Sequence, residues 1–197
     1  MRTRTFSEEE KEEIKRKMKE IGLPMLKAEG LTHMSISKLA EAVGIGKSTF
    51  YSFYSSKEEF VQEILADNRK QFLENLRIGL NGRKKYPNEE SKEIIRRIVN
   101  DVDYVYQSFS LEDEIALRKM SEEKGVPFID LEKERRIIDF VTSMMDGVKE
   151  NLDYVVIANT MKIIVFTYEQ KEMLHASGFE RTVNRMVDLL IDLIFEK

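Results

Sequence analysis

The residues with the clearest capacity for recognition chemistry lie together at positions 47–57, which read KSTFYSFYSSK. A cation and two hydroxyls come first, at Lys47, Ser48 and Thr49, and four aromatic rings follow within five residues. Ammonium, hydroxyl and phenol groups donate hydrogen bonds to phosphate oxygens, and lysine also binds base edges. If these side chains open a helix, its free backbone donors favour an anion as well. The pattern predicts contacts with a nucleic-acid backbone and with base edges in a major groove.

The four rings divide between two faces when the segment forms a helix. Phe50 and Tyr54 lie four residues apart, so they share one face and are predicted to be core. Tyr51 lies off that face, and we expect it to face DNA rather than to join the core. Phe53 also points away from the core face, but it cannot donate a hydrogen bond. We therefore expect Phe53 to contact a thymine methyl group or simply to pack.

Two helices and a tight turn are needed to place this segment. Ser35 can cap a short helix that runs through Val43, and Gly44 supplies the left-handed residue that ends it. Only residues 45–46 separate that end from Lys47, where the next helix starts. Helices joined by so short a turn must cross steeply, which is the geometry of a helix-turn-helix.

A longer helix is predicted ahead of this pair, over about residues 7–29. Ser7 and Glu10 have the spacing of a reciprocal capping box, which marks the start of a helix. Pro24 removes one backbone donor and is expected to kink or loosen the last turns. Gly30 is expected to end the helix.

The rest of the chain is predicted to form further helices. A second capping box, Ser56-Lys-Glu-Glu59, opens a long helix that runs to about Leu80. Apolar stripes at helical spacing predict helices over residues 94–105, 137–152, 154–168 and 179–194, the last with a cap at Ser177. The expected fold is all-α, with an N-terminal three-helix DNA-binding domain at residues 1–57 and a C-terminal helical domain at residues 58–197.

Composition and charge narrow the class of protein. The 197 residues include no cysteine, which excludes disulfides and thiolate metal sites. No leader peptide and no membrane-spanning apolar run is found, so we expect a soluble, cytoplasmic protein without a membrane partner. Residues 1–57 carry 11 Lys and Arg against 8 Asp and Glu, whereas residues 58–197 carry 21 against 28. A basic head on an acidic body fits a small nucleic-acid site on a larger non-binding domain.

This N-terminal pattern resembles the tetracycline-repressor (TetR) family of transcriptional regulators. The family's pattern is a glycine, a Ser/Thr-initiated second helix, a turn of the type A..AGVS and the segment K.TLYYHF.SKE.L. Here it reads Gly30, then SISKLAEAVGIG at 35–46, then KSTFYSFYSSKEEF at 47–60. Gly46 stands where a capping serine is frequent, Phe53 where His or Tyr is common, and the proline in the first helix is unusual. The resemblance spans about residues 10–65.

The resemblance implies a homodimeric regulator, a repressor that a small-molecule effector releases from a palindromic operator in double-stranded DNA. Lys47 and Lys57 stand at two successive predicted helix starts, where each could hold a phosphate, although a single lysine is usually a solvated surface residue. The predicted DNA-binding residues are Ser35, Lys38, Gly46, Lys47, Ser48, Thr49, Tyr51, Phe53 and Lys57.

The same resemblance implies a ligand pocket in the helical body. Aromatic and methionine side chains could line it, with a tyrosine or arginine as polar anchor, but for each residue taken singly a place in the core is favoured. The methionine and aromatic content favours an apolar or amphipathic effector. The candidate ligand-binding residues are Tyr104, Phe109, Arg118, Phe128, Phe140, Met144, Met161 and Phe166.

The two C-terminal helices suggest how a dimer would form. Residues 154–168 are apolar nearly all round, and residues 179–194 carry a broad apolar face. Two such helices from each of two chains would form a four-helix interface that buries this surface. A two-fold dimer would place two heads in successive major grooves and would require a roughly palindromic site.

Two other functions compete with a ligand-responsive repressor. One is a DNA-binding regulator whose body only dimerises or docks a protein partner. The other, much less favoured, is a helical enzyme, but no Ser/His/Asp set has nucleophile spacing and no catalytic residue is predicted. His33 and His175 lie far apart, without carboxylates at metal-ligand spacing, so no metal site is predicted. No cofactor is predicted either.

Overall fold

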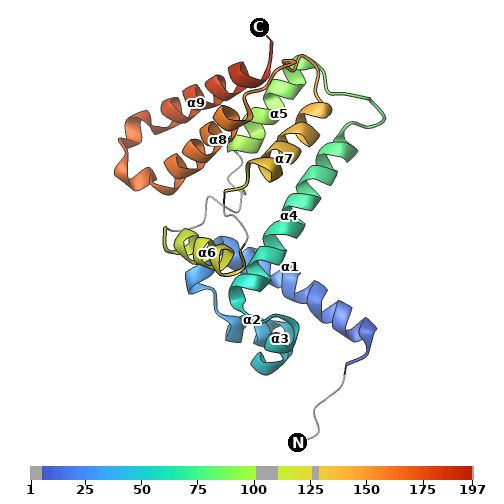
Figure 1. Ribbon diagram of the computed structural model, residues 1–197. Coiled ribbons are helices and arrows are strands. Elements are labelled where there is room, and N and C mark those ends of the chain that lie inside the picture. Colours follow the sequence, from blue (N-terminus) through green and yellow to red (C-terminus); the bar gives the residue numbers. More distant parts are fainter. Residues whose placement is uncertain (1–5, 101–110, 126–128, 197) are drawn as a thin grey trace, which may run out of the picture. The chain divides into compact units, whose positions relative to one another are not determined.

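The computed structural model describes residues 6–100, 111–125 and 129–196. All regular elements in these ranges are helices, which confirms the all-α fold (Figure 1). None of the described helices is long and apolar enough to cross a bilayer. In chain order they are α1 (Glu8–His33), α2 (Ile36–Val43), α3 (Lys47–Phe53), α4 (Lys57–Gly79), α5 (Asn88–Asn100), α6 (Leu111–Glu123), α7 (Leu131–Ser143), α8 (Tyr154–Glu169), the 3-10 helices η2 (Lys171–Met173) and η3 (Ala176–Gly178), and α9 (Phe179–Ile194).

The chain divides into two compact units. Unit 1 takes its described residues from Met1–Arg69 and Ser108–Met120, and unit 2 takes its own from Lys70–Gln107 and Ser121–Lys197. Two helices therefore belong to both units, because the unit boundaries fall inside α4 and inside α6. These compact units differ from the domains expected from the sequence, at residues 1–57 and 58–197. The domain boundaries stay a prediction.

α1 starts as predicted, and its helical geometry breaks at Gly30, the residue expected to end it. The Ser7 hydroxyl accepts the Glu10 N–H at 3.1 Å and the Glu10 carboxylate accepts the Ser7 N–H at 2.8 Å, so the capping box is closed. At Pro24, where a kink or a loosening of the last turns was expected, the backbone stays helical. The non-helical residue inside α1 is Gly30, whose φ of 71° is left-handed and suits glycine. The helix then continues to His33.

α2 and α3 form the predicted helix-turn-helix in unit 1. The Ser35 hydroxyl precedes α2 and accepts the Lys38 N–H, and Gly44 ends the helix with a φ of 81°. α3 then starts at Lys47, after two residues of turn. α2 packs against both α1 and α3, so it holds the three-helix arrangement together.

The start of α4 differs from the predicted capping box in one bond. The Ser56 hydroxyl accepts the Glu59 N–H at 3.0 Å, as expected. The Glu59 carboxylate instead accepts the backbone N–H of Ser55 at 2.7 Å, together with the Ser55 hydroxyl. The carboxylate therefore fixes the residue before the cap, and with it the chain between α3 and α4.

Unit 2 is built round a core shared by its helices. α8 packs against both α7 and α9, and α5 packs against α9. Fully burying an aliphatic side chain contributes about 1.5–3 kcal/mol relative to leaving it exposed, so this cluster dominates the stability of the unit. Its most deeply buried members are Met145, Ile157, Ile164, Val187 and Leu190, each at most 1% exposed.

The helix predicted over residues 137–152 was wrong beyond Ser143, where α7 ends. Past that residue, Met145 forms an isolated parallel bridge with Tyr86, and Gly147 has a φ of 75°. A glycine in the left-handed region interrupts a helix, and the backbone hydrogen bonds to Tyr86 replace helical ones. The apolar stripe in this segment therefore reflects burial in the core, not helical periodicity.

The last two helices agree with prediction in their extent but not in their caps. α8 covers the predicted residues 154–168 and α9 covers 179–194. The predicted cap by Ser177 was wrong, because Gly178 precedes α9 and supplies no side-chain hydrogen bond. The short 3-10 helix η3 leads directly into α9, so the chain enters it without a capping side chain.

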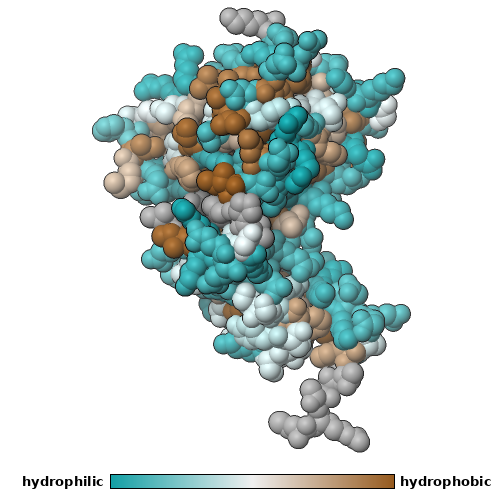
Figure 2. Space-filling model, viewed as in Figure 1, coloured by the Kyte–Doolittle hydropathy of each residue, from teal (hydrophilic) through white to brown (hydrophobic). Residues whose placement is uncertain are grey.

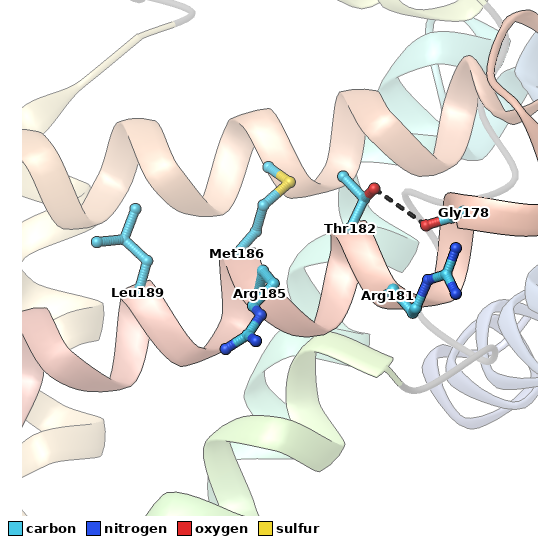
Figure 3. A pocket seen from close by; sticks show the side chains of 6 residues that line it. All are labelled: Gly178, Arg181, Thr182, Arg185, Met186 and Leu189. Carbon is cyan, nitrogen blue, oxygen red and sulfur yellow. Dashed lines mark hydrogen bonds between the residues drawn. The ribbon is translucent and has the colours of Figure 1, made fainter.

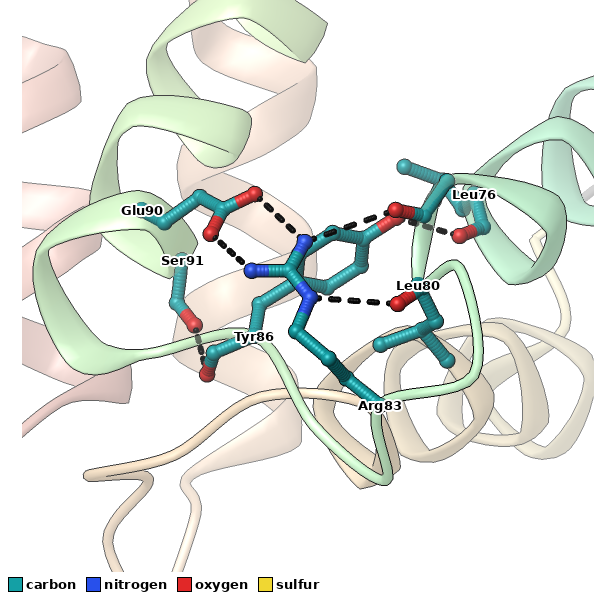
Figure 4. A network of polar contacts seen from close by, with 7 residues as sticks. Leu76, Leu80, Arg83, Tyr86, Glu90 and Ser91 are labelled. Atoms are coloured by element: carbon teal, nitrogen blue, oxygen red, sulfur yellow. Dashed lines mark hydrogen bonds and ion pairs between the residues drawn. The ribbon is translucent and has the colours of Figure 1, made fainter.

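The C-terminal end of α4 is held by side chains from the loop that follows it (Figure 4). Carbonyls in the last turn of a helix lack partners within the helix. The Tyr86 hydroxyl donates to the Leu76 carbonyl, and Arg83 Nε donates to the Leu80 carbonyl at 3.1 Å. The Arg83 guanidinium also pairs with both oxygens of Glu90, at 2.6 and 2.9 Å, and this hydrogen bonding lowers the pKa of the Glu90 carboxyl.

Gly79→Ala tests the packing of this clamp, because an added Cβ would lie 2.5 Å from the Tyr86 hydroxyl oxygen and 3.7 Å from Tyr86 Cζ. We expect it to destabilise the protein by about 1–3 kcal/mol in urea denaturation, since the phenol must move and release Leu76. In a Tyr86→Phe background the oxygen is gone, so the same change should be neutral or should stabilise by up to about 1 kcal/mol. Equal effects in the two backgrounds would contradict the contact.

Candidate nucleic-acid interface

The outer face of α3 carries the polar residues predicted to meet DNA. Gly46, Lys47, Ser48 and Tyr51 are exposed, and Thr49 and Phe53 are half-buried. Tyr51 stands out because 45% of this large ring is exposed, which leaves its hydroxyl available to a partner. No side chain caps the start of α3, since Gly46 occupies the capping position. The structure thus brings a cation, hydroxyls and a phenol together on one short helix.

A cluster of three buried rings anchors the opposite face of α3. Phe50 is 0% exposed and Tyr54 3%, which confirms that both are core, and Phe60 of α4 is fully buried beside them. The ring centroids lie 4.9–5.5 Å apart, within the range of favourable aromatic pairs. Tyr51 meets Phe50 edge to face at 5.2 Å, so the cluster also orients this exposed ring. Burial raises the pKa of the Tyr54 hydroxyl above its ordinary value, which keeps it neutral.

An ionic contact joins the two long helices of unit 1 behind α3. The Lys19 ammonium on α1 contacts the carboxylates of Glu63 and Asp67 on α4, the latter at 2.7 Å. Desolvation lowers the pKa of Lys19, but hydrogen bonds to Asp67 and Glu63 outweigh it and raise the pKa above its ordinary value. The lysine therefore stays charged and ties α1 to successive turns of α4.

The remaining predicted DNA-binding residues lie at the starts of α2 and α4. Ser35 is half-buried and its hydroxyl accepts the Lys38 N–H at 3.4 Å. The Lys38 side chain is largely exposed, with its ammonium 3.9 Å from a carboxylate oxygen of Glu29. Lys57 is half-buried, and its ammonium donates to the backbone carbonyl of Thr32 at 3.0 Å. Lys57 therefore already has a partner inside unit 1.

Sequence reasoning missed one polar residue of unit 1, Asp113 on α6. It is 1% exposed, and its Oδ1 accepts the backbone N–H of Thr32 at 2.5 Å. The two residues are 81 positions apart in the chain, so no local spacing signals the contact. An acidic residue on a helix is normally exposed to solvent, so its burial here was not predicted.

The residues predicted to line a ligand pocket do not form one group in the described structure. Tyr104, Phe109 and Phe128 lie outside the described residues. Met144 is buried in the core of unit 2 and Met161 packs against that core. Phe140 and Phe166 are 40% and 47% exposed, and Arg118 is an exposed residue of unit 1. The pocket assignment stays a prediction.

An apolar surface runs along α8 and α9 in unit 2. Several large apolar side chains on the two helices are 41–53% exposed, and apolar surface gathers in this region in the view of Figure 2. α9 also borders an open groove of about 560 Å³ (Figure 3). The exposed apolar residues are Val155, Val156, Ile163, Phe166 and Leu189, and the groove is lined by Gly178, Arg181, Thr182, Arg185, Met186 and Leu189.

The helix-turn-helix matches a known family. Residues 23–64 match the model described as "Bacterial regulatory proteins, tetR family". No curated protein matches the sequence. The matched segment contains the end of α1, all of α2 and α3 and the start of α4, which are the elements that hold the predicted DNA-binding residues. This segment is therefore similar to the helix-turn-helix of TetR-family regulators.

Solved structures extend the similarity to the whole fold. A TetR-family transcriptional regulator from Cytophaga hutchinsonii has a TM-score of 0.57 at 17% identity, covering 98% of this chain and 100% of that chain. TetR-family proteins from Shewanella sp. PV-4 and Mesorhizobium loti have TM-scores of 0.52 and 0.51 at 14% identity, covering 93% and 94% of this chain and 99% and 98% of theirs. The chain has the fold of TetR-family transcriptional regulators, which confirms the resemblance seen in the sequence.

Stability measurements can separate the anchoring rings from the exposed one. We expect Phe50→Ala to cost about 3–5 kcal/mol, because it opens a cavity among buried rings. Tyr51→Ala should cost less than about 1 kcal/mol, since it loses mainly an edge contact from a surface position. Urea denaturation followed by far-UV circular dichroism gives both values, and a similar loss in the two variants would show that Tyr51 is a core residue.

Proposed function

We propose that this protein is a cytoplasmic, sequence-specific DNA-binding transcriptional regulator, which acts as a homodimeric repressor on a palindromic operator. The observation that carries this proposal is the TetR-type helix-turn-helix, whose α3 buries Phe50 and exposes Lys47, Ser48 and Tyr51. A helix with a buried aromatic face and a polar outer face is suited to lie in a major groove while its unit stays folded.

The proposed contacts follow from residue type and position. Lys47 would bind a base edge or a phosphate, and Ser48, Thr49 and Tyr51 would donate hydrogen bonds to phosphates. Phe53 would contact a thymine methyl group, and Gly46 leaves room for the DNA backbone at the start of α3. Ser35 and Lys38, at the start of α2, would meet flanking phosphates.

Genomic DNA selection with the purified protein tests the proposal. We expect enrichment of one palindromic site, and we expect the Lys47→Ala/Tyr51→Ala variant to bind it at least about tenfold more weakly, because a lost base contact alone is worth roughly 1–3 kcal/mol. Wild-type binding should weaken with added salt. Ile78→Ala, an exposed apolar position on α4 outside the proposed interface, serves as the control. A folded protein that enriches no site would overturn the proposal.

The dimer is proposed to form through α8 and α9. Their exposed apolar side chains would be costly to leave in water, and a second copy of the same two helices would cover them in a four-helix interface. An isologous pairing of this kind is closed, so it stops at two chains. The dimer would also supply the two-fold symmetry that a palindromic operator requires.

Charge substitution on this surface tests the dimer. Wild type should have twice the 23.1 kDa chain mass in light scattering after gel filtration, whereas Ile163→Glu and Leu189→Glu should give the single-chain mass, because each would bury an unpaired charge. Ile78→Glu is the matched control, since Ile78 is 64% exposed but lies on α4. A monomeric wild type, or a dimer that survives both interface changes, would refute this interface.

Release by a small molecule is the remaining part of the proposal. An apolar or amphipathic effector would bind unit 2 in one arrangement of α4 better than in another, and α4 is continuous from unit 2 into unit 1. Ligand and DNA would then oppose each other by the same coupling free energy. The genes beside the recovered operator would indicate which compounds to titrate, and an operator complex that none of them dissociates would favour a regulator controlled by a protein partner.

A further inference from the structure

Two charged side chains bind the backbone of Thr32, in the last turn of α1. The buried carboxylate of Asp113 accepts the N–H of Thr32, and the Lys57 ammonium donates to the Thr32 carbonyl at 3.0 Å. The same ammonium lies 3.5 Å from the Met34 carbonyl, one residue before the Ser35 cap of α2. A charge-assisted hydrogen bond is stronger than a neutral one, so the path of this segment is well determined.

The segment needs such partners because of Gly30. The left-handed φ of Gly30 breaks the hydrogen-bond ladder of α1 three residues before the helix ends, at His33. Amides that follow a break of this kind lack carbonyls in the preceding turn, as at any helix start. Asp113 on α6 takes the place of a local capping residue for Thr32, although it lies 81 residues away in the chain.

The two charged residues stand on the two helices through which the chain passes from unit 1 to unit 2. α4 leaves unit 1 after Arg69, and α6 leaves it after Met120. Lys57 is the first residue of α4 and Asp113 lies in the first turn of α6. A residue of each shared helix thus binds the backbone of Thr32, shortly before α2 begins. α2 packs against α3.

We propose that Asp113 and Lys57 are positioning residues for DNA recognition, which hold the Thr32 segment so that α2 and α3 present the correct surface. The inference rests on the proposed DNA-binding function and gives Lys57 a role other than a phosphate contact. Asp113 is buried, so its effect on operator binding would be indirect, and its hydrogen bond to the Thr32 N–H is one contact that would carry it.

Operator titrations with variants of both residues test the proposal. We expect Asp113→Leu and Lys57→Met each to weaken binding to the selected operator by roughly tenfold, the scale of one unsatisfied buried hydrogen-bonding group. Asp113→Asn keeps an acceptor oxygen and should stay within about threefold of wild type. Because both residues bind the backbone of Thr32, the double variant should be much less impaired than the product of the two single effects. Glu112→Ala, at the exposed neighbour of Asp113, should bind as wild type.

The salt dependence distinguishes positioning from direct contact. Each phosphate contact contributes about 0.9 to the slope of log K against log salt concentration. Lys57→Met and Asp113→Leu should leave this slope unchanged, whereas Lys47→Met, at a proposed direct contact, should lower it. A slope reduced by Lys57→Met would return Lys57 to the phosphate contacts and would overturn its positioning role. Operator binding by Asp113→Leu that equals Glu112→Ala would overturn the role of Asp113.

Amide hydrogen exchange keeps the test independent of the proposed function. The Thr32 N–H should exchange slowly in wild type and in Asp113→Asn and faster in Asp113→Leu, whether or not an operator is found. If wild type selects no DNA site, the function fails while Thr32 protection still reports on the contact. Fast Thr32 exchange in wild type would overturn the inference itself. If Asp113→Leu does not fold, Lys57→Met and Asp113→Asn carry the same comparison.

Discussion

The burial of three rings, Phe50, Tyr54 and Phe60, is the interaction on which the candidate interface depends. α3 has seven residues, and isolated helices shorter than about 12–15 residues are marginal in water. Its start is capped by no side chain. The surface chemistry of α3 therefore exists only because Phe50 and Tyr54 fasten the other side of the helix to Phe60 of α4. This cluster also explains the density of aromatic residues over positions 50–60, since Phe50, Tyr54 and Phe60 are buried while Tyr51 is exposed.

Electrostatic attraction to DNA would come from a few residues on α3 and not from the net charge of the protein. The chain carries a net charge of −4, so the protein as a whole does not attract DNA. Many cations of unit 1 are already engaged: Arg16 pairs with two glutamates on α1, Lys19 bridges to α4, and Lys57 binds backbone carbonyls. Lys47 has no carboxylate partner among the described residues. Affinity would then come from a few well-placed contacts on α3, supported by the duplication of the head in a dimer.

The sequence allowed reliable prediction where structure is determined locally. Ser7, Ser35 and Gly44 act within a turn of their partners, so their spacing predicted the starts of α1 and α2 and the end of α2 correctly. The core positions of Phe50 and Tyr54 followed from helical periodicity alone. Prediction of local structure and burial failed where contacts between residues far apart in the chain determine them. The stripe beyond Ser143 belongs to a segment paired with Tyr86, and the burial of Asp113 depends on Thr32, far away in the chain.

Regulation requires that changes in unit 2 alter the arrangement of α2 and α3, because a ligand shifts an equilibrium only by its differential affinity for two states. A displacement of α4 can reach α2 and α3 only if both ends of α4 are bound to their surroundings. At one end Tyr86 and Arg83 satisfy its last carbonyls, and at the other Lys57 holds the segment before α2. α6 reaches the same segment through Asp113. Movement of either shared helix would strain a hydrogen bond to Thr32, so this residue is where displacements of α4 and α6 would combine into a single effect on DNA affinity.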